Sequence, residues 1–274
     1  LPNGNWIMVC LGIRNEENRG SNMGRETLIL PVVWEKEPFW WKETQYNWPV
    51  CNPLTGKIEK QYPYFLPIND STYEPTKKEY EFQENTLPLN WIHRRVNLEN
   101  SYNLNTKTGY LSMYCLPDTI KERSPYNFIG IKQKETHFET STTMQFNPTI
   151  NGEEAGLCLI QKDDNYILFD VRHEDNENVL RLVINAKKKN AILQKDLVMG
   201  KKYKNYIELK VILKENKYHF YYRYQSNDLW ELFDTTASNL LLSEGYTGSH
   251  IGLYATSNGK KSINFASFDV FKLN

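Results

Sequence analysis

Hydrophobic and polar positions alternate in short runs along this chain, and the pattern is most regular between Glu153 and Asn185. Three apolar runs are separated by two polar clusters in this stretch; the runs are Ala155–Ile160, Tyr166–Val171 and Val179–Ile184, and the clusters are Gln161–Asn165 and His173–Asn178. Each run has the length of a β-strand and is rich in β-branched or aromatic residues, and each break carries Asp and Asn, which favour turns. The pattern predicts an antiparallel meander in the middle of a large β-sandwich, because its apolar face needs a second sheet to cover it.

The same kind of pattern extends to both sides of the meander. Residues 136–146 place Phe138, Met144 and Phe146 on one face and polar side chains on the other, which is typical of a half-buried antiparallel strand. Further strands are predicted at residues 3–14, 23–34, 109–115, 206–213, 218–224, 229–233, 250–256 and 263–271. The only helical signal of note is one turn at Asn239–Leu242. The chain is therefore predicted to be all-β, with a sandwich or jelly-roll architecture.

Two features break the strand pattern near the N-terminus. Pro31 lies inside the predicted strand 23–34, and because proline cannot donate a ladder hydrogen bond, we expect an edge, a bulge or a strand end there. The stretch Tyr62–Glu84 is rich in Pro, Tyr, Lys and Glu and has no clear period. We interpret this stretch as a linker with a boundary near residue 70, and place the linker at residues 69–86, between a region at residues 1–68 and a larger domain at residues 87–274.

Composition excludes some classes of partner. The 274 residues include 33 basic and 33 acidic side chains, so the formal net charge is zero. A dedicated nucleic-acid-binding protein needs a basic face, so we expect no nucleic-acid partner. No apolar run approaches the length of a membrane span, and no membrane partner is expected either. No signal peptide is visible, and the compartment stays open between extracellular and cytoplasmic.

Four cysteines stand at positions 10, 51, 115 and 158, without a C-x-x-C pair or a histidine at metal-ligand spacing. Cys10 and Cys158 lie within apolar strands and are predicted to be buried thiols. The sequence leaves the presence of a disulfide open.

The sandwich itself carries no recognisable catalytic motif. A glycosidase needs two carboxyl groups across the scissile bond, and sandwich glycosidases of the laminarinase type place them on one strand as E-x-D-x-x-E or E-x-D-x-E, spacings that this chain lacks. The acidic clusters Asp163-Asp164 and Glu174–Glu177 lie in predicted turns, where solvated surface residues are expected. A calcium site at either cluster is the alternative, because hard cations take carboxylate oxygens.

Several motifs are similar to one known family. They are G-N-W-I-M-V-C-L-G-I-R at residues 4–14, M-G-R-E-T-L-I-L-P-V-V-W at 23–34, W-P-V-C-N-P at 48–53, and, further on, G-Y-L-S-M-Y-C, H-F-E-T-S-T-T-M-Q-F-N-P, E-E-A-G-L and G-Y-T-G-S-H-I-G-L-Y-A-T-S-N-G. Together they span almost the whole chain. On these motifs the chain resembles the C-terminal part of glycoside hydrolase family 43 β-xylosidases and α-L-arabinofuranosidases.

The resemblance implies a fold and an incomplete active site. Family members pair a five-bladed β-propeller with a concanavalin-like β-sandwich, so residues 1–68 would be a remnant of the propeller, its final blade. The catalytic Asp, Asp and Glu of the family lie upstream of Leu1, which leaves no catalytic residue in this chain. Arg25 of the G-R-E-T motif is implied as a substrate-binding residue; the structural alternative is a pairing with Glu26 or a backbone carbonyl. Tyr246 would contribute the aromatic that the family's F-F-T-G-like loop lends to the active-site rim.

Two hypotheses of function follow. In the first, the chain is the C-terminal portion of an inverting glycosidase acting on β-xylosides or α-L-arabinofuranosides, and the sandwich closes the pocket. In the second, it is a noncatalytic carbohydrate-binding or structural module, or a truncated remnant. The chain alone, lacking the carboxylates, is expected to be inactive. The implied partners are a xylo-oligosaccharide or arabinoside substrate, the missing N-terminal propeller portion and further copies in a homo-oligomer; no cofactor is implied, and a structural or active-site calcium ion stays open.

Overall fold

The computed structural model describes residues 1–15, 20–35, 48–59, 62, 79–95, 100–186, 191–243 and 246–274. The chain divides into two compact units. The first comprises Leu1–Arg14 and Arg25–Thr76, and the second comprises Asn15–Gly24 and Lys77–Asn274. The second unit therefore includes a short segment that, in sequence, connects two strands of the first unit.

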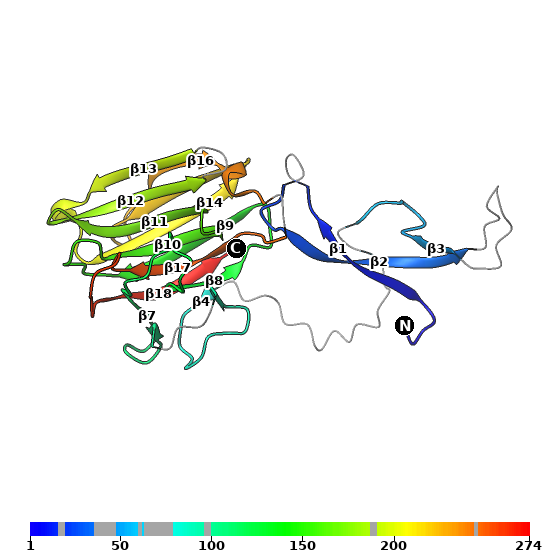
Figure 1. The fold of residues 1–274 in the computed structure, drawn as a ribbon, viewed down its shortest axis with the longest axis horizontal. Coiled ribbons are helices and arrows are strands. Elements are labelled where there is room, and N and C mark those ends of the chain that lie inside the picture. Colours follow the sequence, from blue (N-terminus) through cyan, green and yellow to red (C-terminus); the bar gives the residue numbers. More distant parts are fainter. Residues whose placement is uncertain are drawn as a thin grey trace. The chain divides into compact units, whose positions relative to one another are not determined.

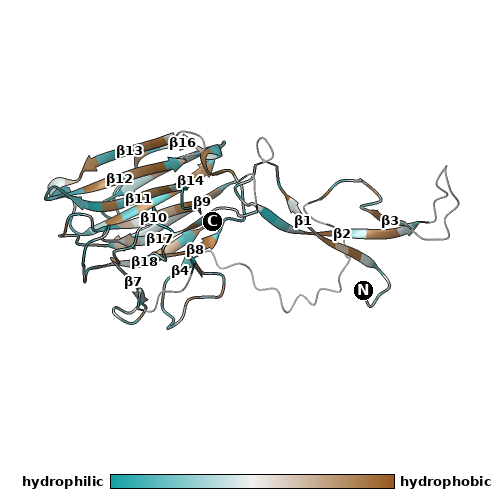
Figure 2. Cartoon of the chain, viewed as in Figure 1, coloured by the Kyte–Doolittle hydropathy of each residue, from teal (hydrophilic) through white to brown (hydrophobic). Residues whose placement is uncertain are grey.

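The first unit contains a three-stranded antiparallel sheet in the order β1 (Trp6–Ile13), β2 (Arg25–Glu35) and β3 (Trp48–Cys51). Both of its faces carry exposed apolar side chains, and Figure 2 shows that long segments of these strands are hydrophobic. Neighbouring residues of β1 point to opposite faces, yet Trp6, Val9 and Leu11 are 56%, 60% and 64% exposed. Pro31 lies inside β2, the middle strand, where it pairs with Ile7 at the position next to the end of the β2–β3 pairing.

The second unit is a β-sandwich of two antiparallel sheets (Figure 1). The first sheet has the order β13-β12-β11-β10-β17-β8-β5 and the second β16-β15-β14-β9-β18-β7-β6, with β4 paired to β18. The strands are β4 (Glu79–Tyr80), β5 (Ile92–His93), β6 (Tyr102–Asn103), β7 (Leu111–Tyr114), β8 (Phe128–Lys132), β9 (Phe138–Gln145), β10 (Glu154–Lys162), β11 (Asn165–Glu174), β12 (Glu177–Ala186), β13 (Ala191–Val198), β14 (Tyr206–Lys214), β15 (Lys217–Arg223), β16 (Glu231–Ala237), β17 (His250–Thr256) and β18 (Phe265–Leu273). The described helices are two short 3-10 turns, Gly200–Lys202 and Ser238–Leu241.

The predicted meander is confirmed as β10, β11 and β12, which are consecutive neighbours in the first sheet. Leu180, Leu182 and Ile184 face the core between the sheets, as the alternation in β12 predicts. Strand β9 alternates between buried and partly exposed residues along its whole length, which confirms the half-buried strand predicted there. The all-β sandwich and the single turn after residue 237 are likewise confirmed.

A second, smaller core lies on the other face of the first sheet. It contains Ile120, Tyr126, Phe128, Cys158, Ile160, Tyr166, Leu168 and Tyr254. The hydroxyl of Tyr254 accepts a hydrogen bond from the Ile120 amide at 3.0 Å, so the chain between β7 and β8 covers this face. Burial on both faces explains why β10 and β11 read as nearly continuous apolar runs in the sequence.

Three expectations need correction or extension. The predicted linker extends to residue 86, but its last part belongs to the sandwich. Glu79–Tyr80 pairs with β18, and Tyr80 and Phe82 lie in the main core. Burial of two aromatic side chains is favourable, and it holds this segment against the sandwich. Strands β3, β4, β5, β6, β8 and β13 lie outside the predicted set. Cys158 is buried as predicted, whereas Cys10, on the three-stranded sheet, is only partly buried; all four cysteines are free thiols. The rest of the linker falls on residues 69–78, outside the described residues.

Candidate functional site

The loop that carries Tyr246 runs between the 3-10 turn and β17. Tyr246 is 70% exposed. Its neighbour Gly245 lies outside the described residues, so the expected Gly245–Gly248 loop is described from Tyr246 onwards. An aromatic ring this exposed offers apolar surface on which a ligand can stack.

A short segment of the second unit, Gly20–Gly24, holds this loop from one side. Ser21 and Ser243 exchange two backbone hydrogen bonds of 3.0 and 3.1 Å, and the Ser249 amide donates to the Asn22 carbonyl at 2.6 Å. Gly24 forms a further antiparallel bridge with Thr247. Ser21, Asn22 and Met23 are fully buried, although Ser21 and Asn22 have polar side chains. The segment is thus an integral part of the sandwich.

Gln161 holds the loop from a second direction. This side chain lies at the end of β10, where the pairing with β11 shifts register, and is 7% exposed. Its Nε2 donates to the Thr247 carbonyl at 3.1 Å and to Ser243 Oγ at 3.4 Å. Its Oε1 accepts from Asn165 Nδ2 at 3.3 Å. Both ends of the Tyr246 loop are therefore bonded to one amide.

His250 follows the loop directly as the first residue of β17. Burial lowers the pKa of His250 to about 4, and the neighbouring Arg94 and Lys132 charges act in the same direction. The imidazole is therefore neutral at ordinary pH, and this end of the sandwich gains no charge from it.

Arg25 is the first residue of β2 in the first unit, paired in register with Ile13, and its side chain is exposed. Its neighbour Glu26 accepts a hydrogen bond from Arg14 Nη2 at 2.7 Å. In the structural alternative Arg25 pairs with the Glu26 carboxylate, and the structure shows Arg14 bonded to this carboxylate.

The acidic turn clusters are engaged by arginines. Asp163 forms ion pairs with Arg94 and Arg95, and Glu174 with Arg172 and Arg181. Within the described ranges, no group of three or more His, Cys, Asp or Glu side chains is placed to hold a metal ion. In the same part of the chain, no helix has the length and apolar character needed to span a bilayer.

Two fully buried carboxyl groups were missed by sequence reasoning. Glu153 is fully buried; burial alone would raise its pKa, but hydrogen bonds from Ser262, Asn264 and the amides of Thr149 and Ile150 outweigh it and lower the pKa below the usual value. These bonds join the turn before β10 to the chain before β18, which makes Glu153 a structural crosslink.

Asp170 in β11 is the second such group, and its environment is the opposite. It lies between Gly156 and Arg181 in register, is fully buried, and neither of its carboxylate oxygens has a hydrogen-bond partner. Burial and the nearby Glu154 raise its pKa well above the usual value, against the attraction of Arg181 and Arg172. A raised pKa suits a general acid, but a group with no exposed surface cannot reach a sugar.

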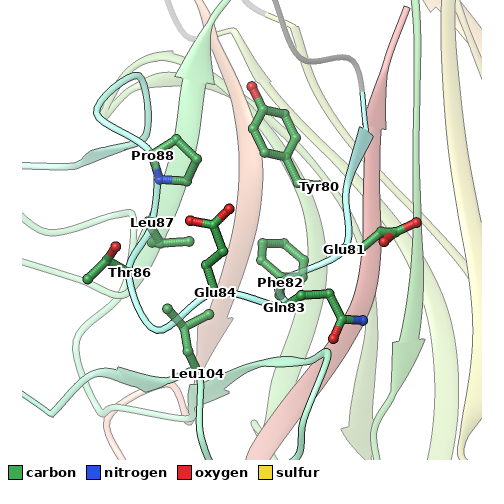
Figure 3. A pocket seen from close by; sticks show the side chains of 9 residues that line it. All are labelled: Tyr80, Glu81, Phe82, Gln83, Glu84, Thr86, Leu87, Pro88 and Leu104. Carbon is green, nitrogen blue, oxygen red and sulfur yellow. The ribbon is translucent and has the colours of Figure 1, made fainter.

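A surface pocket of about 140 Å³ lies beside β4 (Figure 3). It is lined by Tyr80, Glu81, Phe82, Gln83, Glu84, Thr86, Leu87, Pro88 and Leu104. In this view the Glu84 side chain points into the space bordered by Pro88 and Tyr80, and Glu81 points away from it. The lining includes neither Arg25 nor Tyr246, so the pocket is separate from both predicted contacts.

Comparison with known families decides the classification of the sandwich. Residues 79–274 match the family described as the β-xylosidase C-terminal concanavalin A-like domain. The chain belongs to this family. The match covers both sheets of the sandwich and Tyr246, and confirms the resemblance found in the sequence motifs; Arg25 lies outside the matched range.

Two curated relatives match nearly the whole chain, including the part before the β-xylosidase C-terminal concanavalin A-like domain. A xylosidase/arabinosidase of Butyrivibrio fibrisolvens is 29% identical over 98% of this chain and 50% of its own length. A non-reducing end α-L-arabinofuranosidase of Bacteroides ovatus is 27% identical over 99% of this chain and 49% of its own length. The chain thus spans about half the length of the curated relatives it matches.

Solved structures agree on the fold. A family 43 structure from Bacteroides ovatus superposes with a TM-score of 0.85 at 24% identity and covers 100% of this chain and 52% of its own. The BlXynB protein of Bacillus licheniformis reaches 0.80 at 25% identity, with 99% and 51% covered. Both the three-stranded sheet and the sandwich therefore have counterparts in family 43 enzymes.

Proposed function

We propose that this chain is the C-terminal portion of a glycoside hydrolase that cleaves β-xylosides or α-L-arabinofuranosides derived from xylan, with inversion at the anomeric carbon. The observation that carries the proposal is the near-complete coverage of the chain by relatives named as xylosidase and arabinofuranosidase, each about twice as long. Inverting hydrolysis requires an acid and a base on opposite sides of the glycosidic bond, and we assign these groups to an N-terminal propeller portion.

In this proposal the sandwich contributes to the rim of the sugar pocket. Tyr246 presents its exposed ring to the substrate, because sugar rings carry apolar C–H faces that stack on aromatics. Arg25 donates charge-assisted hydrogen bonds to sugar hydroxyl groups. These roles rest on the family resemblance together with the exposure of both side chains.

The exposed apolar surface of the first unit supports a further covering portion. Trp6, Val9, Leu11 and Trp48 are each more than half exposed, and the sheet has an open edge at β1. Such a surface invites aggregation unless another element packs on it. We therefore assign residues 1–68 to the final propeller blade. Of the predicted linker 69–86, we keep residues 69–78 as the linker and add residues 79–86 to the sandwich of residues 87–274.

The test begins with the intact mass of the protein isolated from its source. A mass well above 32.4 kDa supports the proposal, and the purified protein should then hydrolyse aryl β-D-xylosides or aryl α-L-arabinofuranosides. Proton NMR of the first product formed reports the anomeric configuration, and a retained configuration contradicts the inverting mechanism. Tyr246→Ala should lower kcat/KM, whereas Ile263→Ala, which removes another exposed apolar side chain, should not.

A noncatalytic carbohydrate-binding module is the second candidate. The sandwich has a continuous core of its own, which favours independent folding, and Tyr246 is exposed on it. A native mass near 32.4 kDa together with retardation on xylan-containing gels that Tyr246→Ala abolishes would favour this candidate. Light scattering on the same sample tests the predicted homo-oligomer.

A further inference from the structure

Gln161 connects three parts of the chain that are distant in sequence. The side chain leaves the end of β10 at a register shift, where an extra residue loosens the ladder and allows the side chain to leave the regular alternation. It is 7% exposed and bonds Ser243 and Thr247, the two described residues that flank the Tyr246 loop. Its position within the sandwich therefore controls a loop that reaches solvent.

The orientation of the Gln161 amide is fixed by Asn165. The Asn165 side chain is itself largely buried and donates to Gln161 Oε1 at 3.3 Å. With Oε1 accepting this bond, Nε2 is left to donate to the Thr247 carbonyl and Ser243 Oγ. Because Asn165 already fixes the Gln161 side chain, little additional side-chain conformational entropy is lost when Gln161 bonds the loop.

The opposite side of the loop is held by backbone hydrogen bonds. The Ser21–Ser243 and Asn22–Ser249 bonds are made by main-chain atoms and are independent of side-chain identity at those positions. A substitution of Gln161 can therefore loosen the loop without disturbing that pairing.

We propose that Gln161, oriented by Asn165, is a positioning residue that holds Tyr246 at the sugar-binding rim; this inference rests on the proposed function. Gln161 acts through the loop, since its amide is committed to Ser243 and Thr247. Loss of its donated bonds should lower the fraction of molecules in which Tyr246 is correctly placed, and should therefore weaken substrate binding more than the chemical step.

Two measurements test the proposal on the protein in its native length. Amide hydrogen exchange should become faster at residues 246–249 in Gln161→Ala and in Gln161→Glu, because glutamate keeps the acceptor for Asn165 but cannot donate to Thr247. With an aryl pentoside as substrate, Gln161→Ala should raise KM about threefold to tenfold, the range given by one neutral hydrogen bond, with kcat nearly unchanged. Gln194→Ala, on the exposed edge strand of the same sheet, is the matched control.

A double-mutant cycle separates positioning from general destabilisation. If Gln161 acts through Tyr246, Gln161→Ala should add nothing to the KM of Tyr246→Ala. Additive effects, or unchanged loop exchange in an active enzyme, overturn the inference and leave the proposed function standing. A third outcome is faster loop exchange in the Gln161 variants together with an unchanged KM in Tyr246→Ala. This outcome overturns the proposed role of Tyr246 itself, and the inference falls with it.

Discussion

Gly24 and Gly248 lie in direct backbone contact. A Cβ atom placed on Gly24 would lie 2.3 Å from the Gly248 nitrogen, and one placed on Gly248 would lie 2.1 Å from the Met23 carbonyl oxygen. Gly24 also has a φ of +64°, which residues with a side chain rarely adopt. The segment that precedes Arg25 and the loop that follows Tyr246 can therefore meet only because both positions are glycine.

The first prediction concerns this contact. Gly24→Ala should destabilise the sandwich by about 2–4 kcal/mol, because it combines an unfavourable φ with overpacking against backbone atoms that cannot rotate away. Gly200→Ala is the matched control, since Gly200 has a φ of +54° and open space around it. Urea unfolding of both variants separates the two contributions, and equal losses would show that the contact is looser than the structure indicates.

The second prediction concerns the crosslink at Glu153. Its folded-state pKa is lowered by the hydrogen bonds it accepts, so its contribution to stability is present above the ordinary value of 4.5 and is lost as pH falls through the folded-state pKa. Glu153→Gln should cost about 1–3 kcal/mol at pH 7 and should flatten the stability profile below pH 4.5. The exposed Glu177→Gln serves as the control. An unchanged profile at acid pH would contradict this role.

Asp170 gives a prediction of opposite sign. Its folded-state pKa is raised above the ordinary value of 3.8, so the folded state retains a proton that the unfolded chain releases, and stability falls as pH rises above 3.8 towards the folded-state pKa. Asp170→Asn, which is neutral at every pH, should be more stable than the native protein at pH 7 and should show a flatter decline between pH 4 and 7. Asp228→Asn at an exposed turn provides the reference. If Asp170→Asn is less stable than the native protein at pH 7, the Asp170 carboxylate is ionised in the native protein and its charge is balanced by Arg181 and Arg172.

The edge strand β13 leads to a prediction about solubility. Lys195 on this strand reaches the other sheet, where its Nζ donates to the Phe233 carbonyl at 2.8 Å and pairs with Asp234 at 3.0 Å. Ile192 and Val198 on the same strand are 74% and 60% exposed. An inward-directed charge on an edge strand opposes pairing with another chain, so Lys195→Ile should increase self-association in light scattering. Lys214→Ile, at the exposed end of an interior strand, should have a smaller effect.

The sequence predicts strands well where burial imposes a pattern. The runs that became β10 and β11 are buried on both faces, and β9 alternates because one of its faces is partly exposed. Strand β13 escaped prediction because Ile192–Val198 are all exposed at the sheet edge and follow no period. Strand β8 is a five-residue run interrupted by Gly130, which is too short for a periodic signal.

Site residues that depend on tertiary contacts could not be found in this way. Glu153 is bonded by Ser262, 109 residues further along, and Gln161 by Ser243, 82 residues away. Neither residue type nor local spacing distinguishes them from solvated polar residues at strand ends. Tyr246 and Arg25 were found through family motifs, and their contacts with substrate remain predictions.

The cysteines give the molecule two built-in chemical reporters. Cys115 and Cys158 are buried in the sandwich, and burial raises the pKa of both thiols, so neither should react with iodoacetamide until the sandwich opens. Cys10 and Cys51 belong to the three-stranded sheet and are only partly buried. In a single alkylation time course followed by peptide mass spectrometry, Cys10 and Cys51 should therefore react first, and modification of Cys115 and Cys158 would time the opening of the sandwich without a label having to be introduced.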